Sequence, residues 1–202
     1  MGTAVRTATE DDIAKLAVML GRAFQDDPVA RFIEPDDDRR RRVLPRIYAM
    51  QLRGFFIGQG ATEVIVLDGT VKAGALWNPP GRWRTPAPTQ IRQFPTVLRL
   101  AGRNIGRLVS VFGAVEKAHP AEPHWYLAEL GTAPDSQRTG LGRLLLNSRL
   151  ARCDVAGEPA YLETPEVNVP YYERFGFQVK GEISIPRGGP TVYPMWRPAG
   201  GA

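Results

Sequence analysis

The sequence predicts an α/β (α+β) fold, with a mixed, mainly antiparallel central sheet that is flanked by helices on both faces. An early pair of apolar strands is joined by Asp-Gly, which is a strong hairpin signal. Further downstream, strand-like and helix-like segments alternate. The chain has 202 residues, of which 43% are hydrophobic, enough for one full core. Because no linker, repeat or heptad pattern interrupts it, we expect a single domain over residues 1–202.

The first half is predicted to hold a short strand, two helices and the hairpin. Thr9 has the character of an N-cap, and an apolar helical stripe follows it from Ile13 to Phe24. The second helix contains Pro45, either in its first turn or as a kink. The expected ranges are a strand near 3–8, a helix over 38–56 and hairpin strands over 63–67 and 71–77.

The middle of the chain, residues 79–123, is longer than a simple hairpin-to-strand connection requires. It begins Pro-rich and then reads as one or two helices over 90–117. Insertions of this kind often carry substrate contacts, or they merely cover a sheet face, and the sequence leaves both open. The expected elements after it are strands over 160–163, 177–185 and 191–196, and a helix over 166–174.

The segment from His124 to Val155 combines a strand, a tight glycine turn and an amphipathic helix. Strict alternation would place Trp125, Leu127 and Glu129 on one face of the strand, opposite Tyr126, Ala128 and Leu130. Apolar residues with helical spacing follow the turn: Leu141, Leu144, Leu145, Ala151 and Val155.

The glycine turn QRTGLG, residues 137–142, opens that helix. Unpaired N–H groups at a helix start, beside the positive end of the helix dipole, form a site for phosphate. Gly140 and Gly142 lack Cβ, so the backbone can approach an anion closely. An ordinary turn is the alternative.

The turn resembles the R/Q-x-x-G-x-G/A turn of the GNAT superfamily, the acyl-CoA-dependent N-acyltransferases. Downstream, Asn168, Tyr172, Gly176 and Phe177 match its Asn…Tyr-x-x-x-Gly-Phe segment. AFQDDP, EPHWYL, LETPEVNVPYYERFGF and GGPTVYPMWRP are similar to segments of puromycin N-acetyltransferase and its relatives. The resemblance implies the GNAT fold and acetyl transfer from acetyl-CoA, as cosubstrate, directly to a primary amine of a small molecule or peptide. Antibiotic resistance is one role that it suggests.

This sequence departs from the puromycin enzyme at two positions. Asp27 stands where that enzyme has an aromatic residue, and Glu129 where it has a small hydroxyl-bearing residue. An acidic rim at Asp27 would favour a cationic amine, although Asp27 could equally be a turn or helix-end residue. Puromycin itself is therefore not the expected acceptor. Phe24 and Asp27 are the predicted substrate contacts.

The resemblance also implies a coenzyme site in three parts. The turn would bind the diphosphate, a splayed strand edge would bind the pantetheine, and Asn168 would hydrogen-bond the coenzyme. Solvated charge is the alternative for Arg138 and Arg143, and helix capping for Asn168. The predicted cofactor-binding residues are Leu130, Gly131, Thr132, Gln137, Arg138, Thr139, Gly140, Leu141, Gly142, Arg143 and Asn168.

By resemblance, Tyr172 is the tyrosine that protonates the leaving thiolate, with packing under the coenzyme as its alternative role. Tyr171 is expected in the core. The general base is Glu129 or Glu163, and a buried glutamate with a pKa raised toward neutrality would suit. A structural ion pair is the alternative for both. His119 and His124 are expected to be surface or hydrogen-bonding residues.

Charge and cysteine content limit the other function classes. A net charge of +5 and a pI near 9.7 would suit nucleic acid, but the dense run Arg39–Arg42 follows four acidic residues and has no interleaved aromatics. The single cysteine, Cys153, is expected to be a buried structural thiol, and no metal site is expected. A cytoplasmic location is expected and a homodimer is left open. The rival functions are a catalytically silent acyl-CoA sensor and a nucleic-acid-binding module.

Overall fold

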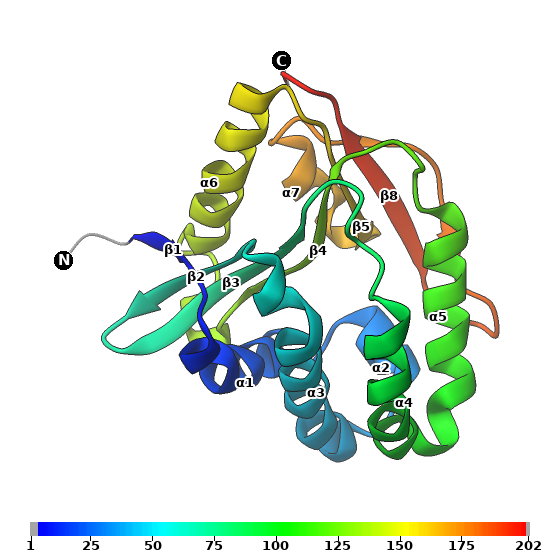
Figure 1. Cartoon of the computed structure of the whole chain (residues 1–202). Coiled ribbons are helices and arrows are strands. Elements are labelled where there is room, and N and C mark those ends of the chain that lie inside the picture. The colour runs from blue at the N-terminus through cyan, green and yellow to red at the C-terminus, as the bar shows by residue number, and fades with distance from the viewer. Residues whose placement is uncertain (1–3, 201–202) are drawn as a thin grey trace.

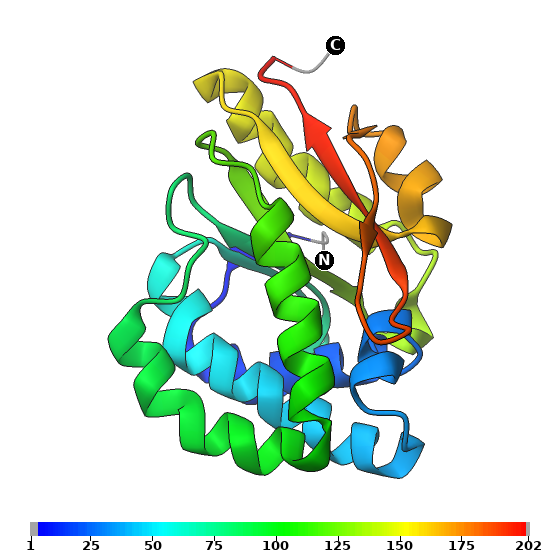
Figure 2. The ribbon, with the colours of Figure 1, turned by 90° about the vertical axis from the view of Figure 1, so that its right-hand side faces the viewer.

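The computed structural model describes residues 4–200, which form one sheet with helices on both faces (Figures 1 and 2). The sheet order is β1-β2-β3-β4-β5-β8-β6, and β7 also pairs with β8. Every pair is antiparallel except β4 with β5. The predicted mixed, mainly antiparallel fold is therefore confirmed. The strands are β1 (Val5–Thr7), β2 (Thr62–Leu67), β3 (Thr70–Asn78), β4 (Trp125–Thr132), β5 (Ala160–Pro165), β6 (Gln178–Val179), β7 (Ile183–Ser184) and β8 (Thr191–Arg197).

The helices agree with the sequence except near residue 30. Thr9 caps a short 3₁₀ turn that leads into the first helix, as expected. The second expected helix begins at residue 37 and continues through a π turn to Phe56, with Pro45 inside it. The short helix that begins at Pro28 was not among the expected elements, although Asp27 followed by Pro28 is a helix-start signal. The helices are α1 (Ile13–Ala23), α2 (Pro28–Ile33), α3 (Asp37–Gln51), α4 (Ala87–Ala101), α5 (Ile105–Ala118), α6 (Leu141–Ala156) and α7 (Val169–Glu173).

One expected strand needs correction, and the bound of another lies outside the described residues. The expected first strand reached Thr3, which lies outside the described residues. The single strand expected over 177–185 is wrong, because Gly181, at φ 142°, separates β6 from β7. No helix in residues 4–200 has the length and apolar character needed to cross a membrane.

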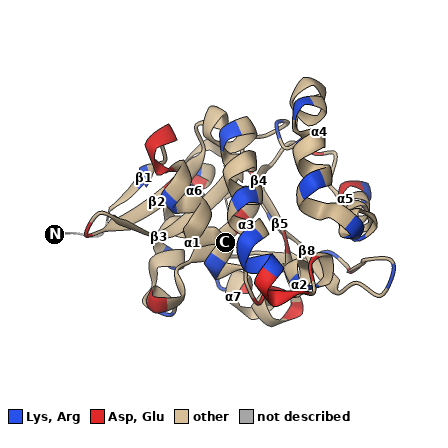
Figure 3. Cartoon of the chain, turned by 90° about the horizontal axis from the view of Figure 1, so that it is seen from below, with Lys and Arg blue, Asp and Glu red and all other residues tan. Residues whose placement is uncertain are grey.

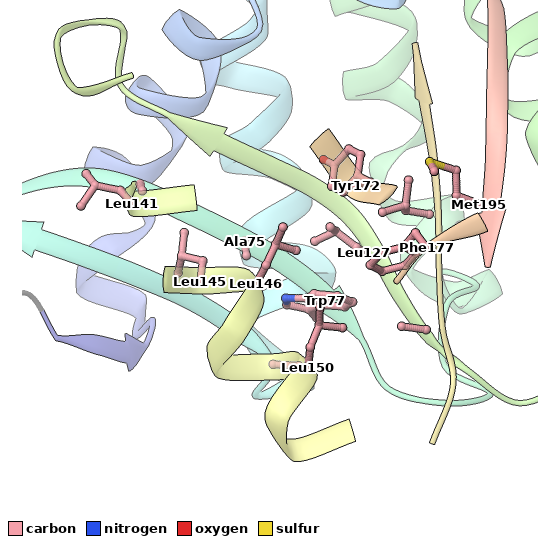
Figure 4. Close-up of a cluster of buried hydrophobic side chains, with 14 of the residues drawn as sticks. Ala75, Trp77, Leu127, Leu141, Leu145, Leu146, Leu150, Tyr172, Phe177 and Met195 are labelled. Carbon is pink, nitrogen blue, oxygen red and sulfur yellow. The ribbon is translucent and has the colours of Figure 1, made fainter. Parts of the chain in front are cut away.

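Helix α6 buries a different stripe from the one predicted. Leu144 is 38% exposed and Val155 is 92% exposed, and Ala151 is also exposed, so these three do not face the core. Leu146 and Cys153 lie on the buried side instead, with Leu141, Leu145 and Leu150 (Figure 4). The error arose because a helix with apolar residues on several sides has no unique stripe.

Two apolar layers hold the sheet between helices. On one face, α6 and α7 pack over Trp77, Leu127 and Phe177 (Figure 4). On the other, α1 and α3 pack over Val64 and Leu76. Helix α5 belongs to the insertion and runs across the front of the view in Figure 2, between α3 and β8. The insertion contains two helices, which resolves the alternative left open by the sequence.

The arginine run at the start of α3 is partly structural. Arg41 pairs with Asp38 at the surface. Arg40, by contrast, is fully buried and donates hydrogen bonds to the main-chain oxygens of Gln25 and Glu34. The interpretation of this run as a solvated helix start is therefore wrong for Arg40, which ties the α1–α2 connection to α3. The remaining Lys and Arg residues are spread over several helices (Figure 3).

Close packing of α1 on the sheet depends on paired glycines. Gly74 of β3 lies opposite Gly131 of β4. A Cβ atom at Gly74 would lie 2.5 Å from Cδ1 of Leu16, and one at Gly131 would lie 2.7 Å from Cδ2 of Leu20. Both leucines are fully buried, so neither can move aside cheaply.

We expect Gly74→Ala to lower the free energy of unfolding by about 1–3 kcal/mol, since it overpacks this contact. Gly113→Ala in α5 is the matched control, because a Cβ atom there meets nothing within 4 Å. That control should be neutral or stabilise by up to about 1 kcal/mol. Urea unfolding of both variants measures the difference, and equal midpoints would refute the role given to Gly74.

Candidate active site

The central parallel strands β4 and β5 separate after a very short pairing. They are in register only at Trp125 with Ala160 and at Tyr126 with Tyr161. Beyond these pairs β4 continues beside β3, and β5 continues beside β8. In Figure 1 the two strands lie together near the top and diverge below. We call this opening the strand fork. The predicted pantetheine-binding edge, residues 130–132, lies on its β4 side.

A bulge in β4 changes which side chains face the site. Leu76 lies opposite Glu129 but Trp77 lies opposite Leu127, so Ala128 is an extra residue in β4. The predicted strict alternation is therefore wrong, because Glu129 lies on the opposite face from Leu127. Leu127 packs with α6 and α7, while Glu129 faces Tyr48 of α3.

A glycine inside a strand, such as Gly131, suggests a place where the ladder opens or bulges. The ladder is open there on the β5 side, but there is no bulge, because Gly131 stays paired with Gly74 of β3. Because Gly131 has no side chain, α1 can pack close to the sheet at this position. The bulge lies three residues earlier, where nothing in the sequence marks it.

The glycine turn presents main-chain donors at the start of α6. Gly140 is the N-cap, at φ 90°, and no side chain caps the helix. Arg138 also has a left-handed conformation, at φ 62°. The first N–H groups of α6 thus have no intrahelical acceptor, and nothing approaches the Cα of Gly140 closely on its open side. Gln137, Arg138, Thr139, Gly140 and Arg143 are exposed. These donors and charges fit a diphosphate.

Helix α7 and its N-cap contain three residues of interest, Asn168, Tyr171 and Tyr172. Tyr172 is buried against Phe177, and its hydroxyl points away from that ring (Figure 4). Burial, with Tyr171 and the charge of Glu129, raises the pKa of Tyr172 well above its usual value. Asn168 occupies the N-cap position but makes no side-chain capping bond and is exposed. The capping alternative for Asn168 is therefore wrong.

Tyr171 is not the simple core residue that was expected. It is half-buried, and its hydroxyl lies 3.0 Å from the place of a Cβ atom on Gly142. Tyr171 therefore reaches from α7 to the glycine turn. A glycine at position 142 leaves room for that phenol, a constraint that the turn motif alone does not reveal.

The first of two acidic clusters surrounds Glu129. Burial and then the charge of Asp27 raise the pKa of Glu129 to about 8, and a hydrogen bond from Tyr48 offsets part of this rise. Asp27 accepts from the N–H groups of Val29 and Ala30, each at 2.9 Å. It is thus an N-cap of α2, and burial raises its pKa.

Phe24 and Tyr48 complete this cluster. The Phe24 ring lies 5.8 Å from that of Tyr48, and its edge approaches Gly131. Sequence reasoning missed Tyr48, since a tyrosine at helical spacing looks like a core residue. The predicted contacts Phe24 and Asp27 therefore lie beside the candidate base, on the side of the sheet opposite α6.

The second acidic cluster surrounds Glu163 of β5. His119 Nδ1 lies 3.6 Å from Glu163 Oε1. The negative charge of Glu163 contributes to the raised pKa values of Tyr126 and Tyr161, for which burial is the main cause. His119 and His124 are linked through their Nε2 atoms at 3.1 Å. Of the two roles expected for these histidines, surface or hydrogen-bonding, the second is confirmed, because both side chains are buried and form hydrogen bonds.

A structural ion pair was the alternative for both candidate bases, and Glu163 has one potential partner of this kind in His119. Among residues 4–200, no Lys or Arg lies within ion-pair distance of Glu129 or Glu163. By contrast, Glu63 is buried with Arg149 at 2.8 Å and with Arg152. Burial raises the pKa of the Cys153 thiol to about 11, as suits a structural cysteine. The described residues contain no group of three His, Cys, Asp or Glu side chains that could hold a metal ion.

Comparison with known proteins agrees with this geometry. Residues 71–177 match the Acetyltransferase (GNAT) family. A crystal structure from Corynebacterium glutamicum, described as histone acetyltransferase HPA2 and related acetyltransferase, is 30% identical, with a TM-score of 0.73, over 98% of this chain and 97% of that one. An uncharacterized N-acetyltransferase of Schizosaccharomyces pombe is 25% identical over 91% of this chain and 78% of its own length.

A more distant structure shares the fold alone. The polyamine N-acetyltransferase of Drosophila melanogaster is 15% identical, with a TM-score of 0.64, over 98% of this chain and all of that one. The match of the family over residues 71–177 includes the fork, the glycine turn and α7. The chain belongs to the GNAT family of acetyltransferases.

Proposed function

We propose that this chain transfers the acetyl group of acetyl-CoA directly to a primary amine of a small molecule or peptide, at the strand fork. One observation carries the proposal. The β4 bulge puts Glu129, with a pKa of about 8, on the face of the sheet that α3 covers, while Tyr172 lies on the face that α6 covers. A proton acceptor and a proton donor thus flank the opening.

The coenzyme site uses main chain more than side chains. The N–H groups of residues 137–142 bind the diphosphate, and Arg138 and Arg143 add positive charge. The free edge of β4 at residues 130–132 hydrogen-bonds the pantetheine, and Asn168 contributes from α7. When bound, the coenzyme supplies an activated acetyl thioester. A main-chain N–H on the fork edge is also placed to stabilise a developing oxyanion.

Glu129 removes the proton from the amine. A carboxylate in a protein normally ionises near pH 4, too weak a base for this step, whereas a pKa of about 8 gives it useful basicity at neutral pH. Asp27 contributes to that basicity by its charge, and Phe24 shields the same space from water. Tyr172 remains protonated because its pKa is raised, so it has a proton to give to the departing sulfur.

That the acceptor is a primary amine is a prediction, and the identity of that amine is open to assay. Closer kinship to puromycin N-acetyltransferase, and with it a role in antibiotic resistance, belongs to the same set of predictions. Puromycin should therefore be included among the amines screened.

A thiol-release assay with acetyl-CoA and a broad panel of amines tests the proposed function. We expect amine-dependent release of free coenzyme A together with a mass increase of one acetyl group on the amine. Calorimetry with acetyl-CoA accompanies it. Binding without transfer across the panel would favour the silent acyl-CoA sensor, and no binding at millimolar ligand would exclude both.

Tyr172→Phe should reduce kcat by about 10²-fold or more, since it removes the proton donor and keeps the buried ring. Tyr193→Phe is the matched control, because Tyr193 lies on β8, which pairs with the edge of β5 that faces away from β4; it should retain full turnover. Steady-state kinetics with one acceptor amine measures kcat for both variants. Unchanged kcat in Tyr172→Phe would show that the phenol only packs.

Glu129 should give the reaction a distinctive pH dependence. With the wild type, kcat/KM should rise about tenfold per pH unit and level off near pH 8, because only the ionised carboxylate accepts a proton. Glu129→Gln should be about 10²-fold slower and lack this inflection. Comparing both with the same amine removes the contribution of the amine's own ionisation. An inflection that survives in Glu129→Gln would assign the base elsewhere.

The same substitution should stabilise the fold. The pKa of Glu129 rises from about 4.5 to about 8 on folding, so the native state holds a proton that the unfolded chain has lost. Wild-type stability therefore falls as pH increases from about 4.5 to about 8, and then levels off. We expect Glu129→Gln to gain on the order of 3 kcal/mol over the wild type by pH 8 and almost nothing at pH 4. Chemical denaturation at both pH values measures this, and a constant difference would contradict it.

A further inference from the structure

Three buried polar atoms of the second acidic cluster have no hydrogen-bond partner within residues 4–200. They are Oε1 of Glu163, Nδ1 of His119 and the hydroxyl oxygen of Tyr161. The side chains of Glu163 and His119 are 8% and 0% exposed, and Tyr161 is 1% exposed. Burying such groups without partners is costly, so three in one cluster indicate a binding position for a polar group.

The hydrogen bonds of His119 and His124 indicate whether a group bound beside Glu163 would donate or accept hydrogen bonds. Nδ1 of His124 lies 2.6 Å from the carbonyl oxygen of Glu122, to which it donates. Burial lowers the pKa of His124, so its ring is neutral and its Nε2 accepts. His119 therefore donates from Nε2 to His124, and its Nδ1 lies 3.6 Å from Oε1 of Glu163 with no hydrogen bond between them. A carboxylate oxygen accepts hydrogen bonds, so a group that binds beside Oε1 must offer a donor.

Aromatic rings surround the same position. Trp83 stacks on His119 with 3.7 Å between ring centroids. Tyr126 and Tyr161 meet the His119 ring edge-on at 4.8 and 5.0 Å. A carboxylate beside electron-rich rings favours an organic cation over a neutral donor. A primary ammonium has three N–H groups, enough to donate to the Glu163 carboxylate and to the Tyr161 hydroxyl oxygen at once.

The position relates directly to the candidate base. Glu163 lies two residues beyond Tyr161 on β5, and Glu129 lies beyond Tyr126 on β4, one on each arm of the fork. Glu129 and Tyr126 lie opposite Leu76 and Asn78, which share one face of β3, and Tyr126 pairs with Tyr161. By strand alternation, both carboxylates therefore lie on the same face of the sheet. A molecule with its reactive nitrogen at Glu129 could therefore extend a second nitrogen to Glu163.

We propose that the acceptor is a diamine whose second, non-reacting ammonium binds Glu163, His119 and Tyr161. This proposal rests on the proposed function and names the substrate class of its site. The insertion contributes His119 and Trp83, so its role is to complete this second subsite. Glu163 is here a specificity residue, while Glu129 remains the base.

Matched acceptors test the proposal on the full chain. The acceptors are 1,5-diaminopentane with its shorter and longer homologues, each compared with the monoamine of the same length. For at least one diamine we expect kcat/KM to exceed that of its monoamine by about 30-fold or more, mainly because KM is lower. The corresponding amino alcohol should behave like the monoamine. Equal values for diamines and monoamines at every length would overturn the proposal, with the three atoms satisfied by water.

Glu163→Gln should remove the preference for diamines, mainly by raising their KM, because the isosteric amide lacks only the charge. Tyr161→Phe is the second variant, in case the first folds poorly, and should reduce the preference by a smaller factor. Glu166→Gln is the control, since Glu166 is exposed and follows the same strand. A diamine preference that persists in both Glu163→Gln and Tyr161→Phe would contradict the assignment.

Calorimetry separates this proposal from the proposed function. With the coenzyme-bound protein, the preferred diamine should bind the wild type and lose about 30-fold in affinity in Glu163→Gln. Binding of this kind without acetyl transfer would support the subsite and refute catalysis. Acetylation of monoamines without any Glu163-dependent diamine binding would support catalysis and refute the subsite.

Discussion

The short pairing of β4 with β5 is the constraint on which the site depends. Two parallel rungs hold the strands together, and each strand then follows its other neighbour. Main-chain groups on the inner edge of β4 are thereby left for a ligand instead of a strand. The β4 bulge acts at the same place, because it turns Glu129 to the acceptor side while Leu127 stays in the core.

Buried carboxylates in this molecule fall into two kinds. Glu63 is compensated by Arg149 and Arg152, so its charge serves the fold. Glu129 and Glu163 have no such cation in the described residues and are surrounded by phenols, an imidazole or another carboxylate. Burial of a carboxylate without a cation lowers the stability of the fold. The same burial raises the basicity of Glu129 and, in our proposal, lets Glu163 bind a cation. Loss of stability is therefore concentrated where chemistry is proposed.

The sequence predicted the architecture better than the side-chain directions. Hairpin, glycine turn and the Tyr172 segment each have strong local signals, and the structure contains all three where expected. Strict alternation failed at Ala128, because a bulge depends on the partner strand and leaves no local mark. The stripe of α6 failed at Leu144 for a related reason, since tertiary packing selects one of several apolar faces.

The two acidic clusters show the same limit of prediction from sequence. Tyr48 and Trp83 come from segments far from β4 and β5 in sequence, and His119, although close to β4, takes its place by packing on Trp83, so no motif could bring them together. Glu129 and Glu163 were both found as candidates, but their division into base and cation receptor required their neighbours. Arg40 looked like surface charge and is buried, because its acceptors lie on other elements.

A crystal structure with a non-hydrolysable acetyl-CoA analogue tests the central claim most directly. The account predicts the diphosphate on the N–H groups of residues 137–142, and pantetheine amides hydrogen-bonded to residues 130–132. The thioester carbon should then lie between Glu129 and Tyr172. An analogue bound away from the strand fork, or a fork closed by continued β4–β5 pairing, would contradict it.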